Sequence, residues 1–188
     1  PAGRGTGDRP AGVRRQPGRR LVRRSGAAGR PFPATGAAVA AAALRRLRYP
    51  TSVCRHVRAI VAAHGFPLDP WLAPDDDGRA TRRFLASHGL ALATDLVRHK
   101  RADLAVKHVG TDEHAALDRL DRELEQESSH PHRIADLAVN GDDLLAAGVA
   151  PGPAVGTVLR SLLDRVVDDP ALNDHDTLLA LAGGRAAR

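Results

Sequence analysis

Residues 134–169 read IADLAVNGDDLLAAGVAPGPAVGTVLRSLLDRVVDD and predict two helices joined by a tight turn. Asn140 is a favourable N-cap for the first helix, and Gly148 suits the left-handed conformation that often follows a helix end. Pro153 stands in the first turn of the second helix, where a missing N–H costs nothing. The apolar face of that helix repeats at steps of three and four: Val155, Val158, Leu159, Leu162, Leu163 and Val166.

Glycine inside a helix costs about 1 kcal/mol relative to alanine, so Gly156 predicts the close approach of another backbone. Asp169-Pro170 ends the helix, and Asn173 or Asp174 begins a last short one. The free N–H groups of the turn between Gly148 and Gly156 could hold a phosphate. The alternative is a packed helical hairpin whose Gly and Pro residues serve only the turn.

Upstream of this hairpin, helical patterns alternate with breakers. Apolar residues at helical spacing predict helices over 37–48, 51–64, 79–88, 90–108 and from 111 onward. The segment 66–78 is predicted to be a loop that Trp71 and Leu72 anchor. The expected buried positions of these helices are Val39, Ala43, Leu44, Leu47, Val53, Val57, Ile60, Val61, Phe84, Leu85, Leu92, Leu96, Val97, Leu104, Val106, Leu117, Leu120 and Leu124, with Arg82 and Arg83 pointing outward. Strand signals are nearly absent, so the fold class is all-α, a multi-helix bundle.

Positive charge is concentrated at the beginning of the chain. Residues 1–30 hold nine Arg and one Asp, a net charge of +8, whereas the whole chain of 188 residues carries +6. The remainder therefore sums to −2. Residues 1–35 contain few large apolar side chains, which predicts a disordered Arg/Gly/Pro-rich arm. Such an arm could bind RNA, or it could be a coding artefact or an irregular leftover of the missing region upstream.

Further features limit the class of protein. The chain begins with Pro1 and contains no Met, so we expect it to be a piece of a longer reading frame. A single cysteine, Cys54, excludes a disulfide framework and a zinc site built on several thiolates. No run approaches 18 apolar residues and no secretory signal is present, which predicts a cytoplasmic protein that does not span a membrane.

The sequence resembles the C-terminal part of the bacterial CCA-adding tRNA nucleotidyltransferase and poly(A) polymerase family. The resemblance rests on 136–141, 143–144, Gly148, 151–153, Gly156, Leu159, Asn173 and 178–179, and upstream on 44–50, 61–64, 82–85 and 101–103. It implies a truncated HD-like helical region over 36–110, followed by a C-terminal helical RNA-binding-type domain over 111–188. The catalytic head of the family, which uses Mg²⁺ with CTP and ATP, has no counterpart in this sequence. We therefore expect no catalytic residue and no cofactor in this chain.

An HD metal site requires a His-Asp pair and a later Asp. Asp103 occupies the place of the later Asp, but no His-Asp pair precedes it. We therefore expect no metal site and expect His64 to pack at the core or its boundary.

Three functions remain open from the sequence. The first is a fragment that binds and positions tRNA for 3′-end processing; the others are a remnant HD-type phosphohydrolase and a purely structural interaction domain. Phosphate contacts would position the RNA without reading its sequence. The candidate RNA contacts are Arg45, Arg46, Arg82, Arg83, Lys100, Arg101, Lys107, Gly148, Gly152 and Arg160.

Overall fold

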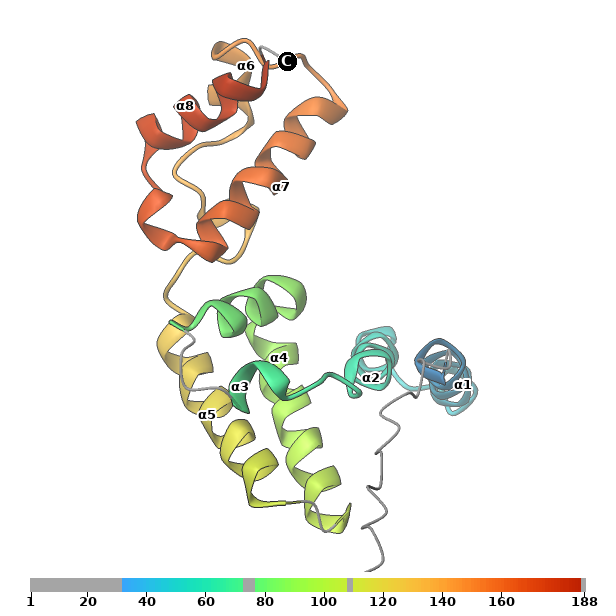
Figure 1. The fold of residues 1–188 in the computed structure, drawn as a ribbon. Helices are drawn as coiled ribbons and strands as arrows, with labels where there is room; N and C mark the ends of the chain where they lie inside the picture. The colour runs from blue at the N-terminus through green and yellow to red at the C-terminus, as the bar shows by residue number, and fades with distance from the viewer. Residues whose placement is uncertain (1–31, 73–76, 108–109, 187–188) are drawn as a thin grey trace, which may run out of the picture. The chain divides into compact units, whose positions relative to one another are not determined.

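The computed structural model describes residues 32–72, 77–107 and 110–186, with side chains from 36 to 183 within these ranges. These residues form eight α-helices and two short 3-10 helices and contain no strand, which confirms the predicted all-α class (Figure 1). The predicted disordered arm lies almost wholly outside the described residues. At its end, however, residues 32–35 already belong to the first helix, so the helix begins five residues earlier than predicted.

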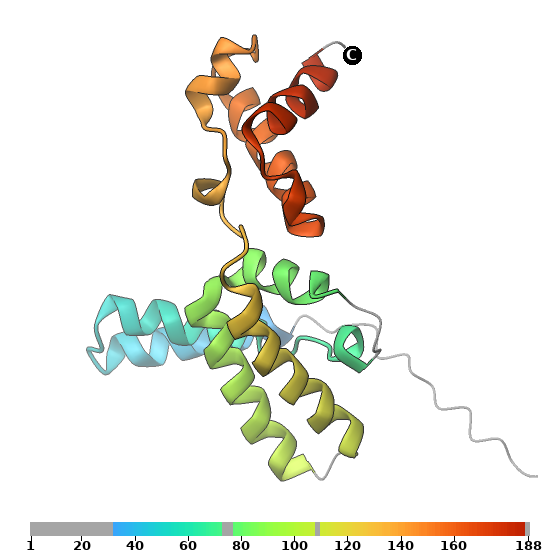
Figure 2. The same cartoon turned by 90° about the vertical axis from the view of Figure 1, so that its left-hand side faces the viewer.

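The first hydrophobic core lies between α3 (Asp69–Leu72), α4 (Arg79–Lys107) and α5 (Thr111–Glu127). Figure 2 shows α4 and α5 running side by side. Gly89 divides α4 with φ 70° and ψ 156°, as the predicted break between two helices requires. Trp71 anchors the segment that precedes α4, because it is buried and its Nε1 donates to Thr81 Oγ1 at 2.8 Å. The expected burial of Leu72 and Val106 is wrong: both face solvent, since each lies at the end of its helix beyond the core.

The second core is formed by η1 (Ile134–Asp136), α6 (Gly141–Ala146), α7 (Pro153–Asp168), η2 (Pro170–Leu172) and α8 (His175–Ala186). The side chain of Asn140 accepts hydrogen bonds from the backbone N–H groups of Asp142 and Asp143, as predicted for an N-cap. Asp174 caps α8 in the same way, through Thr177. The expectation for Gly156 is wrong: no other backbone lies within 4 Å of the position of a Cβ there, and only the Arg160 guanidinium is near, at 3.8 Å.

Arg82 joins the two cores. Its guanidinium is buried, with Nε donating to the Val167 carbonyl at 2.8 Å and Nη1 donating to Glu127 at 3.0 Å and to the Asp77 carbonyl at 2.9 Å. The sequence predicted that Arg82 points outward, and this is wrong: the end of α7 supplies carbonyl oxygens that an internal cation can bind. The neighbouring Arg83 is exposed, and its guanidinium forms a two-pronged ion pair with Asp168 at 2.7 and 2.8 Å.

The helices α1 (Phe32–Arg46) and α2 (Thr51–Ala63) pack against each other as a hairpin (Figure 1). Their contact is made by small residues, because the buried side chains are Ala37, Ala41 and Cys54. The predicted apolar stripe was therefore assigned to the wrong face of α1. Val39 and Leu47 are each 64% exposed, and Val53 on α2 is 37% exposed.

The turn between α1 and α2 contains a backbone conformation unusual for its residue. Arg48 has φ 60°, in the left-handed region, and its N–H donates to the Arg45 carbonyl while that of Tyr49 donates to Leu44. This is the Schellman arrangement that usually places glycine after a helix. The end of α6 has the same hydrogen-bond pattern with Gly148, at φ 90°. Within the described residues, α6 therefore ends in this way with glycine and α1 with arginine.

Helix α5 packs with α3 and α4 in the first core, and the second core begins at Leu137. The domain boundary at residue 110 stays a prediction. No helix within the described ranges is long and apolar enough to cross a membrane.

We expect Arg82→Met to lower the free energy of unfolding by about 3 kcal/mol, because it leaves the largely buried Glu127 carboxylate and the α7 carbonyls without the Arg82 donor. Arg83→Met is the matched control, since it removes an exposed ion pair and should cost about 1 kcal/mol or less. Urea unfolding followed by circular dichroism measures both. Equal losses for the two variants would contradict the role assigned to Arg82.

We expect Arg48→Gly to raise the free energy of unfolding by about 1 kcal/mol, because glycine adopts a positive φ without steric cost. Gly148→Ala tests the equivalent position at the end of α6 and should lower it by about 1 kcal/mol. Thermal unfolding of both variants gives the measurement. A loss of stability in Arg48→Gly would show that the left-handed residue carries no strain.

Candidate nucleic-acid interface

Charge is divided sharply between the helices. The cationic hairpin, defined as residues 36–64, contains five arginines and no acidic residue, whereas residues 65–188 contain fourteen basic and twenty-one acidic residues. The net charge of −2 that the sequence assigns to residues 31–188 is therefore the sum of +5 on the hairpin and −7 on the remainder. A surface of a single sign attracts a polymer of the opposite sign.

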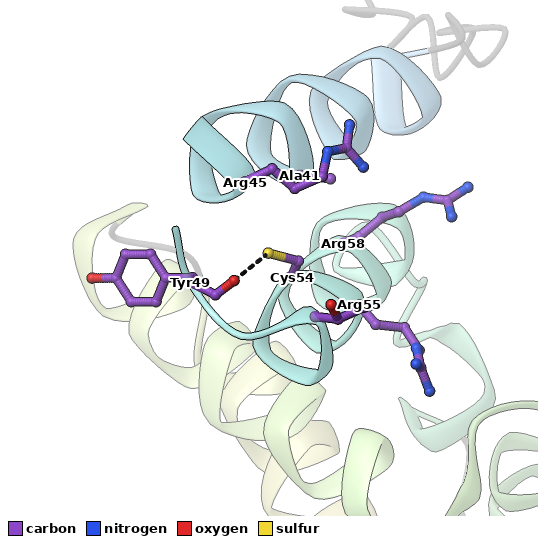
Figure 3. A pocket seen from close by; sticks show the side chains of 7 residues that line it. Ala41, Arg45, Tyr49, Cys54, Arg55 and Arg58 are labelled. Atoms are coloured by element: carbon purple, nitrogen blue, oxygen red, sulfur yellow. Dashed lines mark hydrogen bonds between the residues drawn. The ribbon is translucent and has the colours of Figure 1, made fainter. Parts of the chain in front are cut away.

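An open pocket of about 240 Å³ lies on the cationic hairpin between α1 and α2. Figure 3 shows Arg45 extending from α1, with Arg55 and Arg58 extending from α2. All three side chains are exposed, and no carboxylate of the described residues forms an ion pair with them. The rest of the lining is uncharged and comprises Ala41, Tyr49, Thr51 and Cys54.

The local sequence explains how these three arginines are positioned on the two helices. Arg55 and Arg58 are three residues apart on α2 and therefore share one face of that helix. Ala41 and Cys54 bring the two helices close together, and the Cys54 thiol lies 3.7 Å from the Tyr49 carbonyl that it donates to. Pro50 precedes α2 with an extended backbone, which fixes the reversal of the chain. The hairpin thus presents three arginines from two helices to the same pocket.

Several predicted RNA contacts on α4 already have partners. Arg101 forms ion pairs with Asp118 and Asp121, and the hydrogen bond with Asp118 raises the pKa of Arg101 and lowers that of Asp118. Lys107 donates to Asp103 at 2.6 Å. The Lys100 ammonium lies 4.7 Å from the centre of the Phe66 ring, and burial lowers its pKa.

The predicted contacts therefore fall into separate groups. Arg45 and Arg46 lie in the last turn of α1 and belong to the cationic hairpin. Arg82 is not accessible as an RNA contact, because its guanidinium is buried and donates its hydrogen bonds to groups of the protein itself. Sequence reasoning missed Arg48, Arg55 and Arg58. The signal for them was present, since no acidic residue occurs between Gly36 and Gly65.

The glycine-rich turn before α7 lies in acidic surroundings. Gly152 precedes α7 with φ 99°, and Gly148 ends α6, so the backbone follows the predicted course. Residues 134–182 nevertheless contain eight aspartates against two arginines, Arg160 and Arg165. A phosphate seat formed by Gly148, Gly152 and Arg160 stays a prediction, and the local charge opposes it.

The possible HD position, Asp103, is paired with a lysine. The carboxylate of Asp103 accepts a hydrogen bond from Lys107, and this contact lowers its pKa. Within the described ranges, no group of three or more His, Cys, Asp or Glu side chains is arranged to hold a metal. His64 is half-buried, with Nδ1 donating to the Val61 carbonyl at 2.8 Å.

Comparison with known proteins identifies relatives of the chain. A family model described as tRNA nucleotidyltransferase domain 2 matches residues 34–182. The CCA-adding enzyme of Limosilactobacillus fermentum is 52% identical over 48 residues, which are 26% of this chain and 12% of that enzyme. The CCA-adding enzyme of Lacticaseibacillus paracasei is 43% identical over 51 residues, or 27% and 13% of the two chains.

The matched segments thus span about an eighth of the length of these two relatives. No solved structure is significantly similar to the chain. The resemblance predicted from the sequence is confirmed, because the family model covers well over half of the residues. The chain is a member of the tRNA nucleotidyltransferase domain 2 family.

Proposed function

We propose that this chain binds tRNA by its phosphate backbone through the cationic hairpin and so positions the RNA for processing at its 3′ end. The nucleotide addition itself would be carried out by a catalytic head of the kind found in the family. In this proposal, the chain contributes binding and orientation rather than chemistry.

The single observation that carries the proposal is the pocket between α1 and α2, which Arg45, Arg55 and Arg58 line without a carboxylate partner within the described residues. Guanidinium groups match phosphate oxygens in a planar, two-pronged geometry and remain charged at every physiological pH. Arginines that already pair with carboxylates would have to exchange one anion for another, which gains little. The free guanidinium groups of the hairpin make no such exchange.

Backbone binding also fits the composition of the pocket. Apart from the arginines, its lining offers only one tyrosine, one threonine and the buried Cys54 as polar side chains. Base edges in a helical RNA are hard to reach, so structured RNA is recognised chiefly by shape, phosphates and 2′-hydroxyls. A site dominated by guanidinium groups would therefore bind structured RNA with little sequence preference.

A charge-neutral replacement of the three pocket arginines tests the proposal. We expect Arg45→Gln, Arg55→Gln and Arg58→Gln together to weaken tRNA binding about tenfold or more at low salt, because up to three phosphate contacts are lost. The slope of log affinity against log salt should become shallower by about 2 to 3. Filter binding of a tRNA transcript over a salt series measures both quantities.

The matched control replaces Arg98, Arg122 and Arg165 by Gln, which removes the same charge from exposed positions on α4, α5 and α7. This variant should bind tRNA almost as the unchanged chain does. Both sets are also measured without residues 1–30, because nine arginines there could conceal the effect. Equal binding by the hairpin variant and the control, with and without residues 1–30, would refute the proposal.

A further inference from the structure

A second, larger open pocket of about 540 Å³ lies beside the break in α4. Three histidines line it from three parts of the chain: His56 from α2, His88 from α4 and His132 from the segment after α5. The apolar part of the lining follows Gly89 and includes Leu90 and Leu92. The positive φ of Gly89 interrupts α4 at this point, which places the residues on either side of the break along the pocket.

His132 is the most buried of the three histidines, with 9% of its surface exposed. Its Nδ1 lies 2.8 Å from the carbonyl oxygen of His130. Because a carbonyl oxygen can only accept, Nδ1 carries a proton, and Nε2 is the second hydrogen-bonding atom of the ring. No partner for Nε2 is found within the described residues. The pocket thus holds a nearly buried imidazole with one unused hydrogen-bonding atom.

The charged side chains that line this pocket already have partners of opposite charge. His56 Nε2 contacts Asp95 at 2.8 Å, and the guanidinium of Arg133 pairs with Asp136 at 2.7 Å. Burial lowers the pKa of His88, which keeps that ring neutral near pH 7, and its ring packs against Phe84 with the centres 4.7 Å apart. The pocket therefore offers three flat rings beside leucine side chains, and its charged lining residues have partners of opposite charge, unlike the arginines between α1 and α2.

We propose that this pocket receives an unstacked nucleobase of the RNA that the cationic hairpin holds by its phosphates. The inference rests on the proposed function, because His56 of this pocket directly follows Arg55 of the cationic pocket on α2. Bases in single-stranded segments stack on histidine and other flat side chains, and their edges bind polar atoms such as Nε2 of His132. The volume and the already paired charges of the lining fit a planar heterocycle better than a phosphate.

The test uses the full chain with two separate probes, the nucleoside adenosine and inorganic phosphate. Adenosine has a base but no phosphate, so its binding does not depend on the arginines of the hairpin. We expect adenosine at millimolar concentration to shift the histidine-ring NMR signals of His88 and His132 saturably. Signals of His114 and His175, which do not line the pocket, should stay unchanged.

Ala91→Phe fills the pocket from its rim and should abolish these shifts, whereas Ala86→Phe places the same ring on an exposed part of α4 outside the lining and should preserve them. Ala91→Phe should also leave the salt dependence of tRNA binding unchanged, unlike the triple arginine variant. The failure of one proposal can therefore be told from the failure of the other.

Three results would overturn the base-binding proposal. The first is the absence of any shift with adenosine. The second is equal shifts for His114 and His175, which would show non-specific association. The third is a response of His88 and His132 to phosphate but not to adenosine, which would assign the pocket to an anion.

Discussion

The buried guanidinium of Arg82 is the contact on which the arrangement of the two cores depends. An α-helix ends with carbonyl groups that lack partners within the helix, and the last carbonyls of α7 are those of Val167 and Asp168. Arg82 donates to both, at 2.8 and 3.4 Å, while its other nitrogen binds Glu127 at the end of α5. A cation at that end is also favoured by the helix dipole. Arg82 thus caps α7 from a different core and offsets the high cost of burying its own charge.

The local features of the second core were predictable because each depends on one residue and its immediate neighbours. Asn140 caps α6, Gly148 ends it, and Pro153 opens α7, since capping and turn geometry are set by the chemistry of these side chains. The expectations for Arg82 and Gly156 were wrong for the opposite reason. Their surroundings come from distant parts of the chain, and the periodicity of a single helix contains no information about them.

The prediction for α1 went wrong because hydrophobicity was weighted above size. Val39 and Leu47 were expected to be buried, but the contact with α2 is made through Ala37 and Ala41. The charge of the candidate site was underestimated because only the net charge of the whole body was considered. A net charge of −2 outside the arm suggested a nearly neutral body, and only two of the five arginines of the hairpin were identified from the sequence. Their common pocket depends on how α1 and α2 pack, which the sequence pattern does not specify.

The separation of charge between residues 36–64 and the rest of the chain has a kinetic consequence. Long-range attraction acts on the hairpin and repulsion acts on the acidic helices while a polyanion is still several ångströms away. A tRNA that approaches the chain as proposed would therefore meet the hairpin preferentially before any close contact forms. Electrostatics of this kind acts mainly on the association rate, and salt screens it. In the proposed binding of tRNA, the acidic helices would contribute to recognition without touching the RNA, because they would discourage encounters in unproductive orientations.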